Sequence, residues 1–439
     1  MTSSAQTRPV PISSDASNDR ATHLSTPTPP LADPAGDARA AHAARHDTGF
    51  WLIGGVFAAA MAFSTIPAPL YGYYRERDGF STFMITVIFA AYGVGVVASL
   101  FLAGHTSDWF GRRRLIWAAL AAEVVAAVIF LLWPALPGLL VARVATGVGV
   151  GLVTATATAH MGELHAVGRP GQGRARADRM AVLANLGGLA LGPLVAGLLA
   201  QYVAHPLTVP YLVFLVVFVV AAGLVWTVPE TVDLSSARPR YRPQRVSIPA
   251  VGRPLYYAVA VAAFAAFSIL GLFTSVSSGF VAGTLHHTSP LLSGSITFVV
   301  FGAAATAQIA AAGLPAERQL RVGLALVAVG VLILTGGVWG SSLALFVVGG
   351  VLAGAGAGLS FKGALSTAAG LALPESRSEA IAGLLLVAFV GLVLPVVGIG
   401  VATTSVTLPS ALLGFAIGLL LVTAAVSVRL RSLTASTRA

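Results

Sequence analysis

Long apolar blocks separated by short polar ones fill the chain from about residue 49 to about residue 430. Each block is long enough for an α-helix to cross about 30 Å of hydrocarbon, and only a helix or a closed barrel satisfies its backbone hydrogen bonds there. The blocks therefore predict twelve membrane-spanning helices, at residues 49–73, 82–104, 115–133, 136–161, 180–203, 209–228, 255–282, 290–312, 322–339, 342–372, 380–404 and 407–429.

The composition agrees with a membrane protein. Of the 439 residues, 56% are hydrophobic and 10% are charged, and the mean hydropathy is +0.85. A soluble domain averages about 25% charged residues, so a water-soluble fold would expose large apolar patches. Heavy use of Ala, Gly, Val and Arg is typical of a GC-rich bacterial genome, and we expect a multi-pass protein of a bacterial inner membrane.

The positive charges predict the topology. The net charge is +10, which in a soluble protein would suggest a nucleic-acid partner. Here 22 of the 26 basic residues fall at the termini and in every second loop, and the opposite loops hold only Arg75 and Arg77. By the positive-inside rule both termini are cytoplasmic, and no nucleic-acid partner is expected.

Polar segments divide the chain into regions. Residues 1–48 lack an apolar period and predict a disordered cytoplasmic segment. The arginine- and proline-containing stretch 230–254 predicts a cytoplasmic linker. It separates two six-helix bundles, residues 49–229 and 255–430, and residues 431–439 form a cytoplasmic tail.

The two bundles share short sequence matches. A shift of 209 residues places Gly104, Asp108 and Arg112 on Gly313, Glu317 and Arg321. The same shift places Gly147 and Gly149 on Gly356 and Gly358. Two agreeing groups at one offset indicate a parallel repeat, as in transporters built from related halves.

The loop after the second span carries "GHTSDWFGRRRLI". This stretch resembles the loop signature of the major facilitator superfamily, although a basic residue is usual where Trp109 stands. "RVATGVGVG", with Arg143 and its spaced glycines, resembles the fourth-helix signature. The resemblance extends from about residue 49 to residue 430. It implies an all-α fold of twelve transmembrane helices in two pseudo-symmetric six-helix bundles.

Two further motifs resemble the twelve-helix drug:proton antiporter branch of that superfamily. "GLALGPLVAGLLA" in the fifth span matches its signature, except that Ala196 replaces a common glycine, and "VPET" at 228–231 also fits. The resemblance implies a close seam between the halves, and ordinary small-residue packing is the alternative. The seam residues are Gly188, Gly192, Pro193 and Gly197.

The loop motif is chemically suited to a conformational latch. Asp108 can accept hydrogen bonds from Arg112 or Arg113, and Glu163 ends the fourth span on the same membrane face. The alternative is a solvated basic loop that only sets topology. The predicted latch residues are Gly104, Asp108, Gly111, Arg112, Arg113 and Glu163.

Glu123 and Arg143 are charged residues within predicted spans. Measured from the turn between their helices, they lie within about 6 Å of each other in depth. Because isolated charges in hydrocarbon are costly, we expect them to pair. The pair is either structural or functional; in the functional case Glu123 exchanges protons and Arg143 adjusts its affinity.

In the superfamily, helices 1, 4, 7 and 10 surround a central cavity, and their polar and aromatic residues suit a moderately apolar substrate. Helix packing is the alternative. Lys362, the single lysine of the chain, must meet water, carbonyls or a ligand in its span. The predicted cavity residues are Met61, Ser64, Thr65, Thr154, Thr158, Phe267, Ser268, Ser275 and Lys362.

These patterns predict a secondary transporter rather than an enzyme. The sequence contains no phosphate-binding loop and no metal-ligand cluster, and we expect no cofactor. We expect proton-coupled export of small organic compounds by a monomer that works by alternating access. The alternatives are proton-linked uptake of an organic anion and a membrane sensor that transports nothing.

Overall fold

The computed structural model describes residues 34–103, 106–233, 243–246, 248 and 252–436. The chain divides into a short unit, residues 1–41, and a large unit, residues 42–439. Of the short unit, the described residues 34–41 are helical. All contacts discussed below lie in the large unit.

The first half of the large unit contains the helices up to α9. They are α1 (Pro34–Thr65), α2 (Pro67–Asp78), α3 (Thr82–Ala103), α4 (Ser107–Phe110), α5 (Arg112–Leu132), α6 (Leu136–Gly168), α7 (Ala175–Val182), the π-helical turn η1 (Leu183–Gly187), α8 (Gly188–Tyr202) and α9 (Val209–Val225). Helices α1 and α2 together form the first span, and α7, η1 and α8 form the fifth.

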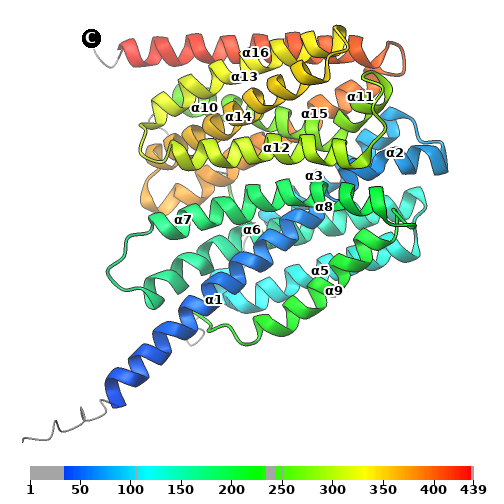
Figure 1. Ribbon diagram of the computed structural model, residues 1–439. Helices are drawn as coiled ribbons and strands as arrows, with labels where there is room; N and C mark the ends of the chain where they lie inside the picture. Colours follow the sequence, from blue (N-terminus) through cyan, green and yellow to red (C-terminus); the bar gives the residue numbers. More distant parts are fainter. Residues whose placement is uncertain (1–33, 104–105, 234–242, 247, 249–251, 437–439) are drawn as a thin grey trace, which may run out of the picture. The chain divides into compact units, whose positions relative to one another are not determined.

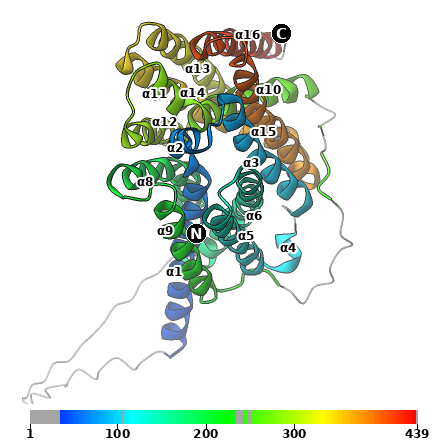
Figure 2. The same cartoon turned by 90° about the vertical axis from the view of Figure 1, so that its right-hand side faces the viewer.

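The second half begins at α10. Its helices are α10 (Arg253–Ser275), α11 (Ser277–Gly283), α12 (Pro290–Ala310), α13 (Ala316–Trp339), α14 (Leu343–Leu371), the 3₁₀ turn η2 (Pro374–Ser376), α15 (Arg377–Ala402) and α16 (Leu408–Ser436). Figures 1 and 2 show α3 to α9 in one group and α10 to α16 in another, with α3 and α15 in contact where the groups meet.

The predicted fold class is confirmed. Within the described residues, eleven helical segments are long and apolar enough to cross a membrane. The remaining predicted span, the sixth in chain order at residues 209–228, corresponds to the shorter apolar helix α9, which has 17 residues. The protein is therefore an all-α, multi-pass membrane protein.

The helix boundaries differ most from the prediction at the first span. Residues 34–48, which we expected to be disordered, form the beginning of α1, and residues 1–33 lie outside the described part of the chain. Hydropathy marks where a helix enters hydrocarbon, whereas the helix itself continues through polar residues. The same effect extends α6 to Gly168 and begins α13 at Ala316, six residues before the predicted span.

The two ends of the bundle are distinguished by their loops. We call inner the end with the arginine-rich loops, such as 169–174, and outer the end with the loops at 79–81 and 284–289. At the outer end, helices of opposite halves are in contact, α3 with α15 and α8 with α12. Ser289 Oγ lies 2.9 Å from Gln201 Oε1 across that interface. The outer end is therefore closed.

Close glycine contacts hold the helices of each half together. Comparing these contacts between α6 and α14 gives the residue shift that relates the two halves. Gly147 packs on α3, Gly149 on α5 and Gly151 on α3. In the second half, Gly354 packs on α12, Gly356 on α13 and Gly358 on α12. Because α3 and α12 are second spans and α5 and α13 third spans, the structurally matching shift within these helices is 207 residues, and the predicted shift of 209 is wrong there.

Candidate functional site: a buried carboxyl, an inner ion cluster and a seam

Glu123 on α5 and Arg143 on α6 are both buried in the first half, with 0% and 2% of their surface exposed. They do not form the ion pair that we predicted. Arg143 Nη1 instead donates to the backbone oxygen of Ser64 at 2.7 Å, and its guanidinium carbon lies 4.7 Å from the centre of the Tyr92 ring. Ser64 is near the end of α1, where helix carbonyls lack an intrahelical donor. Depth alone did not reveal that competing acceptor.

The carboxyl group of Glu123 has an unusual environment. Neither Oε1 nor Oε2 has a hydrogen-bond partner among the described residues. The side chain packs against the bare face of Gly149, where an added methyl group would lie 2.6 Å from Oε1. An ionised carboxylate without partners is very costly in such a place. The site therefore favours an uncharged acid in this conformation.

The inner ion cluster is built around Arg112, the first residue of α5. Arg112 Nη1 lies 2.6 Å from Asp108 Oδ1, and Nη2 lies 2.8 Å from Glu163 Oε1 on α6. Glu163 also accepts a hydrogen bond from the hydroxyl of Thr231. Three of the predicted latch residues thus lie together, and their contacts connect α4, α5, α6 and the segment after α9.

Glu230 completes this cluster and was missed as a site residue. Its carboxylate accepts hydrogen bonds from the backbone N–H groups of Arg112 at 2.9 Å and Arg113 at 3.1 Å. Without Glu230 these N–H groups at the start of α5 would have no acceptor within the helix. A negative charge at this position also interacts favourably with the helix dipole. Gly111, with φ of +94°, allows the chain to turn into α5. The signal was present in "VPET", but the sequence did not show which helix this glutamate would reach.

Arg113 is placed differently from the other predicted latch residues that the structure describes. The guanidinium carbon of Arg113 lies 5.2 Å from the centre of the Trp226 ring. Its Nη1 also donates to the backbone oxygen of Trp226 at 3.3 Å. Arg113 therefore anchors α5 to the end of α9 and not to the acidic side chains. Gly104 lies outside the described residues.

A second inner contact ties the first span to the loop after α6. Asp47 on α1 accepts from Arg169 Nε at 2.8 Å, and Arg176 Nη1 lies 3.5 Å from the same oxygen. The hydrogen bond from Arg169 to Asp47 raises the pKa of that guanidinium above its usual value. Sequence reasoning assigned Asp47 to the disordered segment and did not find this contact.

The four seam residues divide between two neighbours. Gly188 and Gly192 have their closest contacts on α1, within the first half. Gly197 meets the backbone at Pro290 and Leu291 of α12, and the backbone oxygen of Pro193 contacts Gly294. The seam between the halves is therefore made by the outer part of α8, where two glycines allow the backbones to approach closely.

Pro193 also explains one predicted cavity residue. A proline within a helix has no N–H for the carbonyl four residues earlier, which is that of Leu189. Thr65 Oγ1 lies 3.1 Å from this Leu189 oxygen and 3.0 Å from the oxygen of Ala62, so its hydrogen is shared between the two acceptors. Thr65 is 5% exposed, and its hydroxyl serves the contact between α1 and α8 rather than an open cavity.

The other predicted cavity residues on α1 and α6 form hydrogen bonds within their own helices or are buried. Met61 and Ser64 are buried in α1, and the hydroxyl of Ser64 donates to the Met61 carbonyl. Thr154 and Thr158 donate to carbonyls of their own helix α6, and Thr158 is exposed.

The cavity residues of α10 face two separate places. Ser268 lines a pocket of about 430 Å³ between α10, α15 and α16, whereas Ser275 lines a pocket of about 50 Å³ at the outer end. Phe267 is half-buried, and its ring centre lies 4.9 Å from that of Phe361 and 5.4 Å from that of Phe389. Two members of the predicted hydroxyl stripe, Ser268 and Ser275, therefore line different pockets.

Lys362 is half-buried on α14, and its Nζ lies 2.5 Å from the backbone oxygen of Gln308. Gln308 is in the last turn of α12, where a cation is favourable to the helix dipole and replaces missing N–H donors. Asp178 of α7 is also near enough to act on Lys362 electrostatically. We predicted that the Lys362 ammonium would meet water, carbonyls or a ligand, and in the structure it meets a backbone carbonyl.

These features define a polytopic membrane carrier with two related halves, a closed outer end and a buried acidic group. A sequence profile of the Major Facilitator Superfamily matches residues 50–319. The chain belongs to this superfamily, and membrane transport by alternating access is its activity.

Two solved structures show the same fold. A point mutant of the nucleoside transporter NupG has a TM-score of 0.67 and 10% identity, and the match covers 87% of this chain and 99% of that one. A bacterial homologue of the human lysosomal transporter Spinster, inward-facing and unoccupied, has a TM-score of 0.57 and 15% identity, covering 88% of this chain and 95% of that one. No curated protein matches the sequence.

Proposed function

We propose that this transporter exports small organic compounds by proton-coupled antiport across a bacterial inner membrane, acting as a monomer. The observation that carries the proposal is the carboxyl group of Glu123. It is fully buried, and both oxygens lack a partner among the described residues. A carboxyl that is uncharged in one conformation and ionised in another can couple proton movement to a conformational change.

We propose that Arg143 controls the proton affinity of Glu123. Its guanidinium carbon faces the Tyr92 ring, and Nη1 donates to the Ser64 carbonyl in the closed outer conformation. In the proposed cycle, a shift of α1 during opening weakens the Ser64 contact and turns Arg143 toward Glu123. An ionised Glu123 is then stabilised by the opposite charge, and the proton leaves.

Export is supported by the seam. Pro193 and Gly197, which carry the resemblance to the antiporter branch, are the residues of α8 that meet α12. The inner cluster around Arg112 and Glu163 is proposed to stabilise one state of the first half during the same cycle.

Respiring inside-out vesicles that contain the full-length protein test the coupling. Ethidium and a neutral lipophilic dye represent export substrates, and uridine represents the class named for NupG. Addition of an exported substrate should release part of the proton gradient, followed with a pH-sensitive acridine dye. Substrate uptake into these vesicles corresponds to export from a cell.

The decisive variant is Glu123→Gln, with Glu375→Gln as the matched control. Both remove one carboxylate, but Glu375 is exposed in the inner loop before α15. We expect Glu123→Gln to abolish substrate-induced proton release while substrate binding persists, and Glu375→Gln to behave like the parent. Full proton release by Glu123→Gln would remove Glu123 from the proton path.

A further inference from the structure

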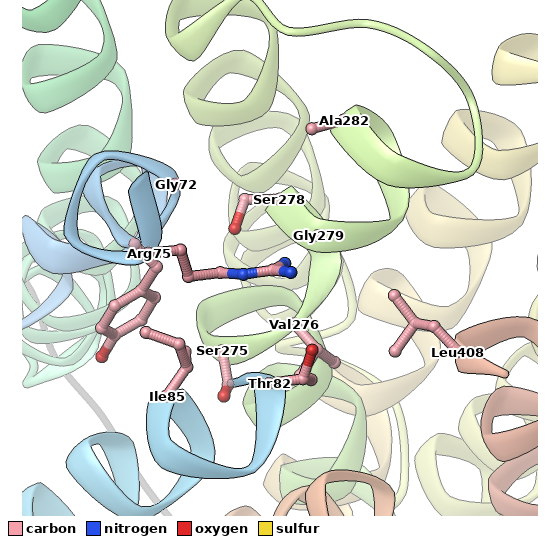
Figure 3. A pocket seen from close by; sticks show the side chains of 11 residues that line it. Gly72, Arg75, Thr82, Ile85, Ser275, Val276, Ser278, Gly279, Ala282 and Leu408 are labelled. Carbon is pink, nitrogen blue, oxygen red and sulfur yellow. The ribbon is translucent and has the colours of Figure 1, made fainter. Parts of the chain in front are cut away.

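The outer pocket of about 50 Å³ is formed by both halves of the transporter (Figure 3). The first half contributes α2 and the beginning of α3, and the second half contributes α10, α11 and the beginning of α16. The residues that line it are Tyr71, Gly72, Arg75, Thr82, Ile85, Ser275, Val276, Ser278, Gly279, Ala282 and Leu408. Among these lining residues, Arg75 is the charged one.

Arg75 extends from α2 into the pocket and across to α11. Figure 3 shows its guanidinium between Ser278 and Thr82, close to Gly279. A methyl group added at Gly279 would lie 3.8 Å from Arg75 Nη1, which places the guanidinium within van der Waals range of α11. In the described chain no carboxylate lies within ion-pair distance of Arg75, whereas the neighbouring Arg77 is held by Asp78 at 2.7 Å.

One buried hydroxyl that has no hydrogen-bond partner in the described chain lines the same pocket as the guanidinium. Ser275 is 2% exposed, and its Oγ has no partner among the described residues. Thr82 is the first residue of the 22-residue helix α3, so the positive end of that helix dipole also faces the pocket. The cation of Arg75, the free hydroxyl of Ser275 and a helix N-terminus together favour a negative charge.

The size of the pocket restricts the ligand. A water molecule needs roughly 10–15 Å³ of such probe volume, so about 50 Å³ holds one small ion with a few waters. A sugar acid or a drug-sized molecule does not fit.

We propose that this pocket binds a small monovalent inorganic anion such as chloride, and that the anion stabilises the state in which the outer end is closed. The pocket exists only while α2 and α3 lie against α10 and α11. A ligand that binds one conformation shifts the equilibrium toward it. This inference does not depend on proton coupling or on the direction of transport.

The natural absence of cysteine allows a clean accessibility assay. Thr86 on α3 is 0% exposed and packs on Gly400 of α15 between the halves, without lining the pocket. In Thr86→Cys, a maleimide reacts only when the outer end opens. With the full-length protein in lipid nanodiscs, we expect saturating chloride to slow labelling about fivefold or more relative to gluconate.

Matched variants separate the anion site from a general salt effect. In the Thr86→Cys background, Arg75→Gln should remove the chloride effect, Ser275→Ala should weaken it, and Arg75→Lys should retain part of it. Arg77→Gln, two residues further along the same helix, should leave it intact. Labelling of Ser366→Cys, an exposed position toward the inner end of α14, should not slow in chloride.

Equal labelling of Thr86→Cys in chloride and gluconate would overturn the proposal. A chloride effect of the same size in Arg75→Gln would also overturn it, provided that this variant elutes as a single species and retains its helical circular dichroism. Slowing by acetate but not by chloride would exclude an inorganic anion site in favour of a carboxylate site.

Discussion

The inner ends of the two halves contain the same local pattern in two different settings. In the first half, Asp108 and Arg112 are four residues apart and form an ion pair, and in the second half Glu317 and Arg321 do the same at 3.2 Å. The side chain of Arg112 is 11% exposed, whereas that of Arg321 is 58% exposed. The difference comes from partners distant in sequence, because Glu163 and Glu230 reach α5.

The repeat shows why the second half lacks one of these partners. The shift of 207 residues that relates α6 to α14 places Glu163 on Gly370, which has open space around it. A local acid–base spacing therefore survives in both halves, while a three-dimensional network exists around α5. An exposed i,i+4 pair contributes about 0.3–0.5 kcal/mol, so the network and not the pair gives the first half its specific inner structure.

Of the substitutions that compare the two halves, removal of the Arg112 side chain is expected to reduce stability most. Arg112→Ala leaves Glu163 half-buried without its cation, and we expect the free energy of unfolding to fall by roughly 2 kcal/mol. Turnover should fall as well, since the proposed latch loses its centre. The measurement is thermal unfolding of the purified protein together with the transport assay.

Arg321→Ala is the control for that experiment, and we expect a change within about 0.5 kcal/mol. Equal destabilisation by the two substitutions would contradict the distinction between a network and an exposed pair.

A smaller difference in stability is expected between substitutions at the N-termini of α5 and α13. Glu230→Gln removes the negative charge that accepts from two N–H groups at the start of α5, and we expect a loss of about 1 kcal/mol. Glu317, in the first turn of α13, faces solvent, so Glu317→Gln should cost at most a few tenths of a kcal/mol. Thermal unfolding at low and at high salt measures both, and an equal loss in the two variants would show that Glu230 is not a special cap.

The spans were accessible to sequence reasoning because hydrocarbon imposes a length and a composition on every crossing helix. The predicted second span, residues 82–104, differs from α3 by one residue. What hydropathy cannot show is structure outside the hydrocarbon, such as the first turns of α1. It also cannot show the π-helical turn at 183–187, which depends on packing rather than composition.

The candidate site was less predictable. Depth from the turn placed Glu123 and Arg143 in the same layer, but rotation about each helix axis decides which side chains meet. Arg143 had a carbonyl and an aromatic ring available, and the sequence did not reveal them. Asp108, Arg112 and Glu163 were grouped correctly because a loop motif fixes rotation as well as depth.

The contact of Thr65 with the carbonyl freed by Pro193 restricts how this sequence can evolve. While Pro193 is present, loss of the threonine hydroxyl leaves the Leu189 oxygen without that donor in a nonpolar environment. If Pro193 is first replaced by a residue that has an N–H, the helix satisfies the oxygen itself and Thr65 becomes free to change. The two positions are therefore epistatic, and the order of substitution decides whether a lineage passes through an impaired transporter.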